Sequence, residues 1–362
     1  MKRITLFITS LISGGAEHQL VNLAGLLVAR GYAVDLVTFS KAPDHYATPA
    51  GVNRIILGEG RSDKVKMLAI WKYFLTLKND VVISFGQREN QICLMPLKFN
   101  RRPKVIAGER NFSYKPGKTE DRLVRNLYKR ANWVVPNSHS QGAYLSAKAE
   151  YLASRIKVIT NYTDLEKYTV AVPPSNELPR IGVFCSYTPQ KNTRRFSEAV
   201  KILKDKVGTT FRIDWYGGIM VKGLYESQVY VNFKKHISDF GIGDVLFLHD
   251  KIDNVQEVMG ECDAICLPSL YEGFSNTLSE AICCGKVCLA SRVSDNPVMV
   301  EDGVNGFLFD PKDVSDIACS FERFFATGVE QRIAMGKSSR AKAEMLFDAD
   351  KFIDSYIELI ES

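Results

Sequence analysis

Several signals that assign a sequence to a common class of protein are missing from these 362 residues. No run of about 18 apolar residues occurs, so no transmembrane helix is expected. The eight cysteines include no CxxC pair and seven lie beyond residue 180, which favours reduced, buried thiols over a disulfide framework or a zinc site. None of the five histidines belongs to a recognisable hydrolase motif. What remains is the composition of an ordinary globular protein, with 46% hydrophobic residues.

Two segments near the N-terminus resemble a signal peptide and a dinucleotide-binding motif, but each lacks residues that such a motif requires. The segment MKRITLFITSLIS begins like a signal peptide, but it has no small-x-small cleavage site and runs into a loop and an amphipathic helix, so we predict a core strand instead. The following LISGGAEHQL is not GxGxxG, and no acidic residue ends the second strand, which argues against a nicotinamide enzyme. Gly14 and Gly15 would let the backbone approach a ligand at a helix start, although a plain tight turn explains them equally well.

The net charge of +6 conceals an asymmetry between the two halves of the chain. Residues 1–170 carry 26 Lys and Arg against 13 Asp and Glu, whereas residues 171–362 carry 21 against 28. The basic excess is densest in 98–130. Such a half should be attracted to anionic lipid or another polyanion, although a solvated basic face is an equally good interpretation. No zinc-finger, ribonucleoprotein or other nucleic-acid-binding motif supports nucleic acid as the partner.

Strand and helix signals alternate along both halves. In the first half, strands are predicted at 4–11, 33–39, 53–57, 80–85, 104–110, 132–138 and 155–161, with helices at 17–30, 121–130 and 142–153. In the second, strands are predicted at 180–187, 211–218, 245–250, 262–268, 286–291 and 306–311, with helices at 196–206, 225–240, 277–284 and 314–360. A linker rich in proline and polar residues, 170–179, separates the halves. We therefore predict an α/β protein of two doubly wound parallel-sheet domains, with ligands at the carboxyl ends of the strands.

The stretch YEGFSNTLSEAICCGKV, residues 271–287, predicts a loop, a helix and the start of a strand. Ser275 or Asn276 is a good N-cap, and Gly285 fits the position just after the helix. A helix start at the carboxyl end of a strand suits a phosphate group. Glu272 and Glu280 are then placed to accept hydrogen bonds from hydroxyls on either side of that phosphate. The alternative is a capped surface helix with two solvated glutamates.

Three other motifs carry charged residues that have both a structural and a functional interpretation. In SYTPQKNTRRF, residues 186–196, three cations lie at a helix start, where they are unfavourable unless an anion is present, so they favour a diphosphate over a solvated surface. In GERNFSY, residues 108–114, the adjacent Glu109 and Arg110 fit either an ion pair or acceptor binding. The sequence Asp348-x-Asp350 looks like a metal-binding motif, but no strand precedes it, so a surface position is preferred.

Together these motifs resemble the retaining GT-B glycosyltransferases of glycosyltransferase family 4, which includes many bacterial surface-polysaccharide enzymes. The resemblance rests on GGAE at 14–17, GERN at 108–111, NYTD at 161–164, TPQKN at 188–192, YEGFSNTLSEA at 271–281 and EDGVNGFLFDP at 301–311. It implies two Rossmann-like domains, 1–170 facing the acceptor and membrane and 171–345 binding the nucleotide sugar. A last helix in 346–362 is expected to return to the first domain.

The resemblance also implies a role for each matching residue. Glu280 would bind the ribose, Glu272 the donor sugar near the reacting carbon, and Lys191 the diphosphate, with Glu272 and Lys191 the catalytic pair. Further donor contacts would come from Gly15, Arg194, Arg195, Gly273, Phe274, Ser275, Asn276 and Thr277. Acceptor contacts would come from Gly14, Glu109, Arg110 and Asn111. One departure concerns the Gly-Arg that relatives carry before the lysine: here the residues are Cys185 and Ser186, which leaves Arg194, Arg195 or Lys191 to hold the phosphate.

The function implied by this resemblance is transfer of a hexose or N-acetylhexosamine from a nucleoside diphosphate sugar to a lipid-linked glycan. A UDP-sugar is favoured as co-substrate, and neither a metal nor another cofactor is expected. The enzyme should lie in the cytoplasm, peripherally attached to the anionic inner face of the membrane, and bind no nucleic acid. Two rival hypotheses are a non-catalytic sugar-nucleotide-binding subunit, motivated by Ser186, and a sugar-nucleotide epimerase of similar architecture.

Overall fold

The computed structural model describes residues 1–362 except 41, 61, 111–125, 171–177 and 222. The described residues form two compact units, one made of 1–162 with 348–362 and the other of 163–347. The chain thus passes into the second unit before the predicted linker, most of which lies outside the described residues. None of the helices in the described part of the chain has both the length and the apolar character needed to cross a membrane.

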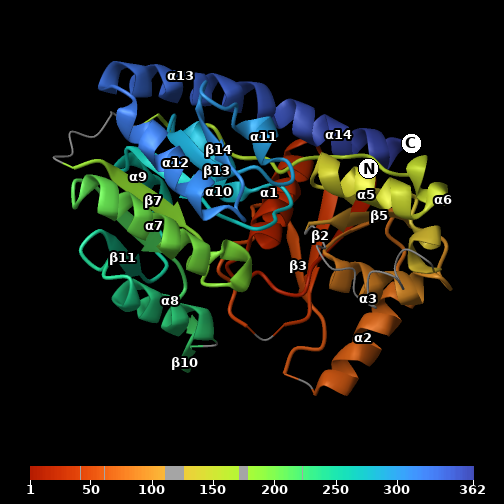
Figure 1. Cartoon of the computed structure of the whole chain (residues 1–362). Helices are drawn as coiled ribbons and strands as arrows, with labels where there is room; N and C mark the ends of the chain where they lie inside the picture. The colour runs from red at the N-terminus through yellow and green to blue at the C-terminus, as the bar shows by residue number, and fades with distance from the viewer. Residues whose placement is uncertain (41, 61, 111–125, 171–177, 222) are drawn as a thin grey trace. The chain divides into compact units, whose positions relative to one another are not determined.

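The first unit is built on a parallel six-stranded sheet in the order β3-β2-β1-β4-β5-β6 (Figure 1). Its strands are β1 (Arg3–Phe7), β2 (Ala33–Thr38), β3 (Asn53–Ile56), β4 (Val81–Phe85), β5 (Lys104–Glu109) and β6 (Trp133–Pro136). Its helices are α1 (Gly15–Ala29), α2 (Asp63–Thr76), α3 (Gln87–Leu97), the short 3-10 helix η2 (Tyr128–Arg130), α5 (His139–Lys148), α6 (Glu150–Ala153) and α14 (Ala349–Glu361). This strand order is that of a doubly wound nucleotide-binding fold, which confirms the predicted fold class.

The structure of this unit differs from the predictions, or leaves them partly undescribed, at three places. The segment predicted as a strand at 155–161 forms only an isolated bridge, between Ile156 and Val134, and is otherwise irregular. The helix predicted at 121–130 lies mostly outside the described residues, and its described end is η2. Helices α2 and α3 were not predicted, because their apolar residues recur with only a weak helical period.

Helix α14 packs into the core of the first unit, beside α1 (Figure 1). Its apolar face contributes Phe352, Tyr356 and Ile360 to the same cluster as Leu20 and Leu27 of α1. The Asp348-x-Asp350 pair belongs to the start of this helix. Asp348 accepts a hydrogen bond from the backbone N–H of Lys351 at 3.1 Å, and Asp350 forms an ion pair with Arg30, the residue just after α1, at 2.7 Å. Both carboxylates therefore have structural partners.

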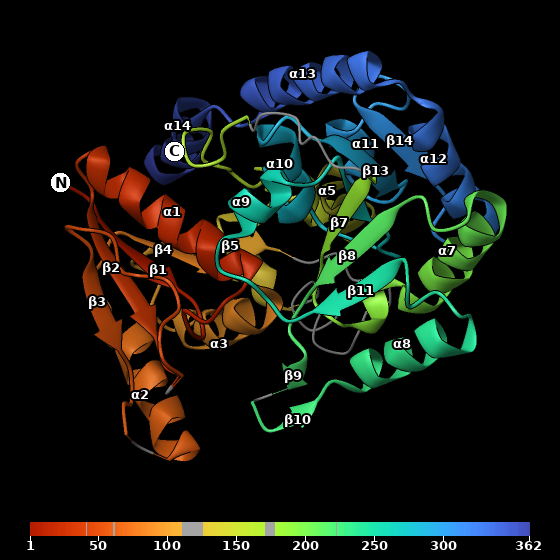
Figure 2. The ribbon, with the colours of Figure 1, turned by 90° about the vertical axis from the view of Figure 1, so that its left-hand side faces the viewer.

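The second unit repeats the topology, with a parallel sheet in the order β11-β8-β7-β12-β13-β14 (Figure 2). Its strands are β7 (Arg180–Phe184), β8 (Arg212–Tyr216), β11 (Leu246–His249), β12 (Ala264–Leu267), β13 (Val287–Ser291) and β14 (Gly306–Phe309), and a separate hairpin pairs β9 (Met220–Val221) with β10 (Tyr225–Glu226). Its helices are η3 (Pro189–Lys191), α7 (Thr193–Val207), α8 (Gln228–Asp239), α9 (Val255–Gly260), α10 (Asn276–Cys283), α11 (Asn296–Met299), α12 (Val314–Ala326) and α13 (Val329–Leu346). The helix predicted at 225–240 therefore starts later, after the hairpin, and the region predicted at 314–360 divides into α12, α13 and α14.

Aromatic side chains fix one helix layer on this sheet. Trp215 of β8 lies edge-on to Phe196 of α7, with ring centroids 5.2 Å apart, and to Phe233 of α8 at 4.9 Å. Phe196 also meets Phe321 of α12 at 6.0 Å. Such edge-to-face pairs add to the stabilisation from apolar burial. The core of this unit also buries six of its seven free cysteines, all but Cys319.

Gly285 ends α10 in a left-handed conformation, with φ at 65°. A Cβ added there would lie 3.3 Å from the carbonyl oxygen of Gly336 in α13, so the position is also crowded. Replacing Gly285 with alanine is expected to lower the free energy of unfolding by about 1–2 kcal/mol from backbone strain, plus the cost of the contact. Gly241 is a matched control, because it follows α8 with φ at 60° in a turn that has the same backbone hydrogen bonds, and nothing lies within 4 Å of an added Cβ. In urea denaturation, Gly285→Ala should lower the free energy of unfolding more than the same substitution at the control glycine. Equal losses would show that α10 and α13 move apart at little cost to accept the added Cβ.

Candidate functional site

The site in the second unit lies where the chain reverses its direction of winding across the sheet. Strands β7 and β12 are neighbours, although most of the unit's first half separates them in sequence. The loop after β7 leads to α7, and the loop after β12 leads to α10. Because both loops leave the carboxyl ends of adjacent strands, they meet there, and this is the position at which open α/β sheets bind ligands.

The start of α10 is organised by its N-cap. The Ser275 hydroxyl accepts a hydrogen bond from the backbone N–H of Leu278 at 3.3 Å, which confirms the predicted cap. The Thr277 hydroxyl donates to the carbonyl oxygen of Phe184 at the end of β7, at 3.0 Å, and so fixes the helix start against the neighbouring strand. Phe274 is buried, edge-on to Phe347 with ring centroids 6.2 Å apart, so only its backbone faces the loop. The first N–H groups of a helix have no acceptor within it, which makes this start suited to an anion.

Lys191 and Glu272 form an ion pair across the two loops. Lys191 Nζ lies 2.6 Å from Glu272 Oε1, and both side chains are largely buried. The loops are joined further by Gln190, whose side-chain amide donates to the carbonyl oxygen of Tyr271 at 2.6 Å and whose carbonyl accepts from Leu270 N–H at 2.8 Å. The Ser294 hydroxyl donates to the Glu272 carbonyl at 2.6 Å. The predicted lysine and the first predicted glutamate are thus brought together and held rigidly.

The ion pair keeps Lys191 charged. Burial alone would lower the pKa of Lys191, but the negative charge of the Glu272 carboxylate beside it holds that pKa above its ordinary value. An ammonium group has three donors, so Lys191 can keep its bond to Glu272 and still reach a second anion.

Glu280 lies one helical turn further along α10 and is half-buried. Burial raises the pKa of the Glu280 carboxyl to about 7, against the opposing effects of a hydrogen bond from Tyr168 and the charge of Lys167. The protein itself offers too little hydrogen bonding and positive charge to offset the burial of this carboxylate in its ionised form. The carboxylate can therefore accept further hydrogen bonds from a ligand. A ligand hydroxyl would supply what is missing.

The two predicted arginines are placed differently from each other. Arg194 is 77% exposed and pairs with Glu198 on the surface of α7, with Nε 3.1 Å from the carboxylate. Arg195 reaches back to the helix start and donates to the Asn192 side-chain oxygen at 3.4 Å. Asn192 has φ at 58° and donates in turn to the carbonyl of Pro311 at 2.7 Å, which anchors this turn. Ser186, which is exposed in the loop after β7, occupies the position at which the resemblance leads us to expect an arginine. Of Arg194 and Arg195, Arg195 is the better placed to replace that arginine.

The first unit carries its own cavity of ≈ 380 Å³ at the corresponding point of its sheet. Its lining includes residues of the first turns of α1 and α3 and the residue just after β5: Gly15, Glu17, Gln87, Arg88, Glu89 and Arg110. Strands β1 and β4 are the neighbours at which this sheet reverses its winding, just as β7 and β12 are in the second unit. Gly14 precedes α1 at its N-cap position, and its carbonyl accepts from the Tyr46 hydroxyl at 3.2 Å.

Arg110 and Glu109 point into different environments. The Arg110 guanidinium lies over the Phe85 ring, 3.5 Å from its centroid, donates to the Tyr356 hydroxyl at 2.5 Å, and lines the cavity. Glu109 is fully buried, receives a hydrogen bond from the Tyr128 hydroxyl, and is not among the cavity-lining residues. Among the described residues no ion pair joins Glu109 to Arg110, and of the two only Arg110 lines this cavity, so acceptor binding by the pair stays a prediction. Asn111 lies outside the described residues.

Sequence reasoning did not single out Glu17 or Glu89, which face this cavity. Burial raises the pKa of Glu17, its own backbone N–H opposes the shift, and the nearby charge of Glu89 adds to it. The Thr9 hydroxyl donates to Glu89. The signal for Glu89 was present, since GQREN directly follows a predicted strand and the carboxyl ends of such strands were expected to carry the ligand site.

Comparison with known proteins gives two family matches that together span residues 13–342. A model described as "Glycosyltransferase Family 4" matches residues 13–167, and one described as "Glycosyl transferases group 1" matches residues 166–342. The second match contains the Lys191–Glu272 pair, and the first contains all six of the lining residues named above for the cavity of the first unit.

Curated relatives and solved structures resemble the whole chain. It is 24% identical over 323 residues to the UDP-Gal:α-D-GlcNAc-diphosphoundecaprenol α-1,3-galactosyltransferase of Escherichia coli, covering 82% of this chain and 80% of that protein. It is 24% identical over 336 residues, 89% of this chain and 88% of the other, to a Campylobacter jejuni α-1,4-N-acetyl-D-galactosaminyltransferase acting on a diphosphoundecaprenol-linked glycan. Anabaena HepE, solved with UDP and glucose, superposes with a TM-score of 0.81 at 20% identity over 100% of both chains. Sucrose-phosphate synthase of Thermosynechococcus elongatus gives 0.84 at 17% identity, covering 100% of this chain and 98% of that one.

Proposed function

We propose that this chain, which belongs to the family 4 glycosyltransferases and has the GT-B fold, transfers a hexose or N-acetylhexosamine from a nucleoside diphosphate sugar to a lipid-linked glycan. A UDP-sugar is the favoured donor, since the name of the Escherichia coli relative specifies a UDP-linked sugar and HepE was solved with UDP. The acceptor class follows the two curated relatives, whose names specify diphosphoundecaprenol-linked glycans. Surface polysaccharide synthesis is the corresponding cellular process.

The main observation that supports a donor site is the Lys191–Glu272 ion pair beside the start of α10. Glu280 lies one helical turn after that start. A diphosphate at the helix start would meet the positive end of the helix and the Lys191 ammonium. Glu272 and Glu280 would then lie on either side of it, as acceptors for the hydroxyls of the sugar and the ribose. Arg195 would supply a further cation from the start of α7.

Catalysis in this proposal depends on neutralising charge that develops on the leaving diphosphate while the sugar becomes oxocarbenium-like. Lys191 and the α10 N–H groups would do this without a metal ion. The anomeric configuration would be retained, with the leaving phosphate oxygen taking the proton of the acceptor hydroxyl. The glycan acceptor would enter the cavity of the first unit, where Arg110, Glu17 and Glu89 can hold its hydroxyls. The enzyme would work in the cytoplasm, attached peripherally to the inner face of the membrane.

Thermal-shift binding tests the donor site directly. We expect one of UDP, GDP and ADP, with UDP the favoured one, to raise the melting temperature of the wild type, because a ligand bound only to the folded state stabilises it. Glu280→Ala should lose this shift, whereas Glu330→Ala, which removes an exposed carboxylate from α13 of the same unit, should keep it. No shift in the wild type at millimolar nucleotide would reject the proposed donor site.

A non-catalytic sugar-nucleotide-binding subunit is the second candidate, and the exposed Ser186 favours it. Both candidates predict nucleotide binding, so turnover separates them. Radiolabelled UDP-sugars incubated with a lipid diphosphate-linked N-acetylhexosamine should give a labelled lipid product if the chain is an enzyme. Binding of a nucleotide sugar without product, across the set of donors, would favour the subunit instead.

A further inference from the structure

The cavity of the first unit differs from the donor site in the third residue of each helix that borders it. The two sheets have the same strand order, so β1 and β4 correspond to β7 and β12, and α1 and α3 correspond to α7 and α10. The third residue of the helix is Glu17 in α1 and Glu89 in α3. At the same positions, α7 carries Arg195 and α10 carries Leu278. Both carboxylates therefore belong to the unit that does not carry the proposed diphosphate site.

Each of these glutamates turns back over the glycine that precedes its helix. Gly14 is the N-cap residue of α1, and Gly86 is that of α3. A Cβ added to Gly14 would overlap a carboxylate oxygen of Glu17, and one added to Gly86 would overlap a carboxylate oxygen of Glu89. A glutamate that reaches back to the N-cap from this position is the acidic half of a capping box. The repeated spacing Gly-x-x-Glu thus places a carboxylate at both helix starts, where an anion would otherwise bind.

Hydrogen bonds hold the two carboxylates in these positions. Glu17 accepts from its own backbone N–H, which is one of the donors that the start of α1 would otherwise offer to an anion. Glu89 accepts from the Thr9 hydroxyl, in the loop after β1. Burial raises the pKa of Glu17, and the charge of Glu89 raises it further, so the two carboxylates repel each other. A phosphate or a carboxylate that entered the cavity would add a third negative charge.

Two arginines balance these carboxylates, so the cavity has no excess of positive charge. The buried Arg110 and the exposed Arg88 line it together with Glu17 and Glu89, two cations against two anions. Arg110 is only 7% exposed, and its Nε has no hydrogen-bond partner among the described residues. A buried N–H without an acceptor is costly, which favours a ligand oxygen beside it. Such a lining offers both donors and acceptors, and this suits the hydroxyl and amide groups of an uncharged sugar.

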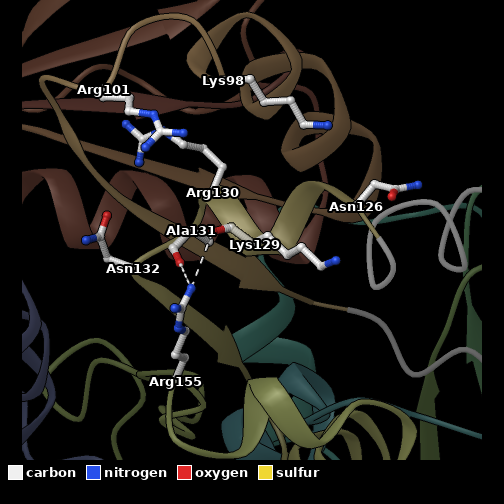
Figure 3. A pocket seen from close by; sticks show the side chains of 8 residues that line it. All are labelled: Lys98, Arg101, Asn126, Lys129, Arg130, Ala131, Asn132 and Arg155. Carbon is white, nitrogen blue, oxygen red and sulfur yellow. Dashed lines mark hydrogen bonds between the residues drawn. The ribbon is translucent and has the colours of Figure 1, made fainter.

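A second cavity of the first unit, of ≈ 630 Å³, has a different charge pattern (Figure 3). It lies at the amino ends of β5 and β6, and its charged lining residues in the described part of the chain are all cations: Lys98, Arg101, Lys129, Arg130 and Arg155. Residues 1–170 carry twice as many basic as acidic residues, 26 against 13. Two carboxylates at the carboxyl ends of the strands are therefore a local feature of the proposed acceptor cavity, contrary to the charge of this half of the chain.

We propose that Glu17 and Glu89 determine acceptor specificity, by excluding phosphate and acidic sugars from the cavity of the first unit and favouring an uncharged terminal sugar. The inference rests on the proposed transfer and on acceptor binding in this cavity. It defines the acceptor class more closely, as a lipid-linked glycan that ends in a neutral hexose or N-acetylhexosamine and not in a hexuronic acid. The same contrast directs the diphosphate of the donor to the second unit, where Arg195 takes the place of a glutamate.

Acceptor kinetics test this selectivity. The probes are a lipid diphosphate-linked N-acetylhexosamine that the wild type uses and the corresponding uronic acid, which differ only at C6. The wild-type kcat/KM should be about a hundredfold higher for the neutral acceptor, because like charges in a binding site suppress the wrong partner. Glu17→Gln/Glu89→Gln, which keeps the shape of both side chains, should reduce this ratio to about tenfold or less by gaining activity on the uronic acid. An unchanged ratio would overturn the proposal.

The matched control is Glu257→Gln/Glu330→Gln, which removes the same charge from the first turns of α9 and α13. It should keep the wild-type ratio, and an equal change in both double variants would show that net charge alone controls the selectivity. The cavity variant should fold, since Glu17→Gln removes a charge that burial disfavours. If the double variant does not fold, Glu17→Gln alone gives the same comparison with a smaller change.

Binding of sodium diphosphate, measured by isothermal titration calorimetry, tests the same residues without turnover. Glu17→Gln/Glu89→Gln should bind one diphosphate more per chain than the wild type, because both helix starts then lack a carboxylate while Arg88 and Arg110 remain. The control variant should bind as many as the wild type. Equal numbers in the wild type and the cavity variant would overturn the inference, even if the chain transfers a sugar. The absence of a thermal shift by UDP in the wild type would instead reject the proposed donor site and leave this difference unaffected.

Discussion

Replacing Lys191 with glutamine is expected to lower kcat by about 10²–10³, with a smaller change in the KM of the donor sugar nucleotide. The reason is that charge on the diphosphate grows as the bond to the sugar breaks, so the ammonium group stabilises the transition state more than the ground state. Steady-state kinetics with a UDP-sugar and a lipid-linked acceptor measure both constants. Lys191→Arg, which keeps the charge, should recover part of kcat.

The same substitution has a structural effect that must be separated from the kinetic one. Glu272 is only 8% exposed, and without Lys191 its carboxylate is left buried without its cation, which should lower the melting temperature. The double variant Lys191→Gln/Glu272→Gln removes this unpaired charge and should recover the melting temperature but not kcat. Lys201→Gln, on the exposed surface of α7, is the matched control and should change neither. A fall in melting temperature with unchanged kcat would mean that Lys191 serves only as the structural partner of Glu272.

Replacing Glu280 with glutamine is expected to weaken binding of a UDP-sugar about 10–100-fold, because hydrogen bonds from the ribose to a charged acceptor are replaced by weaker ones. The pKa of about 7 makes this effect depend on pH. The ionised carboxylate is the better acceptor, so wild-type affinity should fall by up to about tenfold for each pH unit below 7 and level off above it. Isothermal titration calorimetry across this pH range measures the affinity. A UDP-sugar is the suitable ligand, because its diphosphate is esterified at both ends and so does not titrate near pH 7.

The stability of the same variant follows from the direction of the shift. The pKa of Glu280 is raised in the folded protein from an ordinary value of 4.5, so the protonated carboxyl stabilises the fold below that pH, and this contribution is lost as the pH rises through 7. Glu280→Gln should therefore melt at a higher temperature than the wild type at pH 8 and at a similar one at pH 4. If the affinity of wild type and variant falls equally toward low pH, another group controls binding, and Glu280 does not contact the ribose.

The sequence by itself determined the alternation of strands and helices, and with it the doubly wound topology of both sheets. It also determined both ends of α10, because Ser275 caps the start and Gly285 ends the helix through a φ of 65°, and both effects are local. It was less informative where local signals were weak: α2 and α3 were not predicted, and the strand predicted at 155–161 proved to be one bridge. Glu272 precedes a helix with a recognisable Ser275 cap, whereas Glu89 lies in a helix that begins without a side-chain cap, so only Glu272 was predicted.

Only the tertiary structure decided which loops meet. Lys191 and Glu272 lie 2.6 Å apart because β7 and β12 are neighbours in the sheet, and no local spacing encodes that adjacency. The tertiary structure also separated Glu109 from Arg110, since successive residues at the end of a strand point to opposite sides. It gathered part of the basic excess of the first half, with Arg155, into a pocket at the amino ends of β5 and β6. Capping and helix period act over a few residues and can be read from the chain, whereas a binding site joins residues that are distant in sequence and exists only once the sheet has formed.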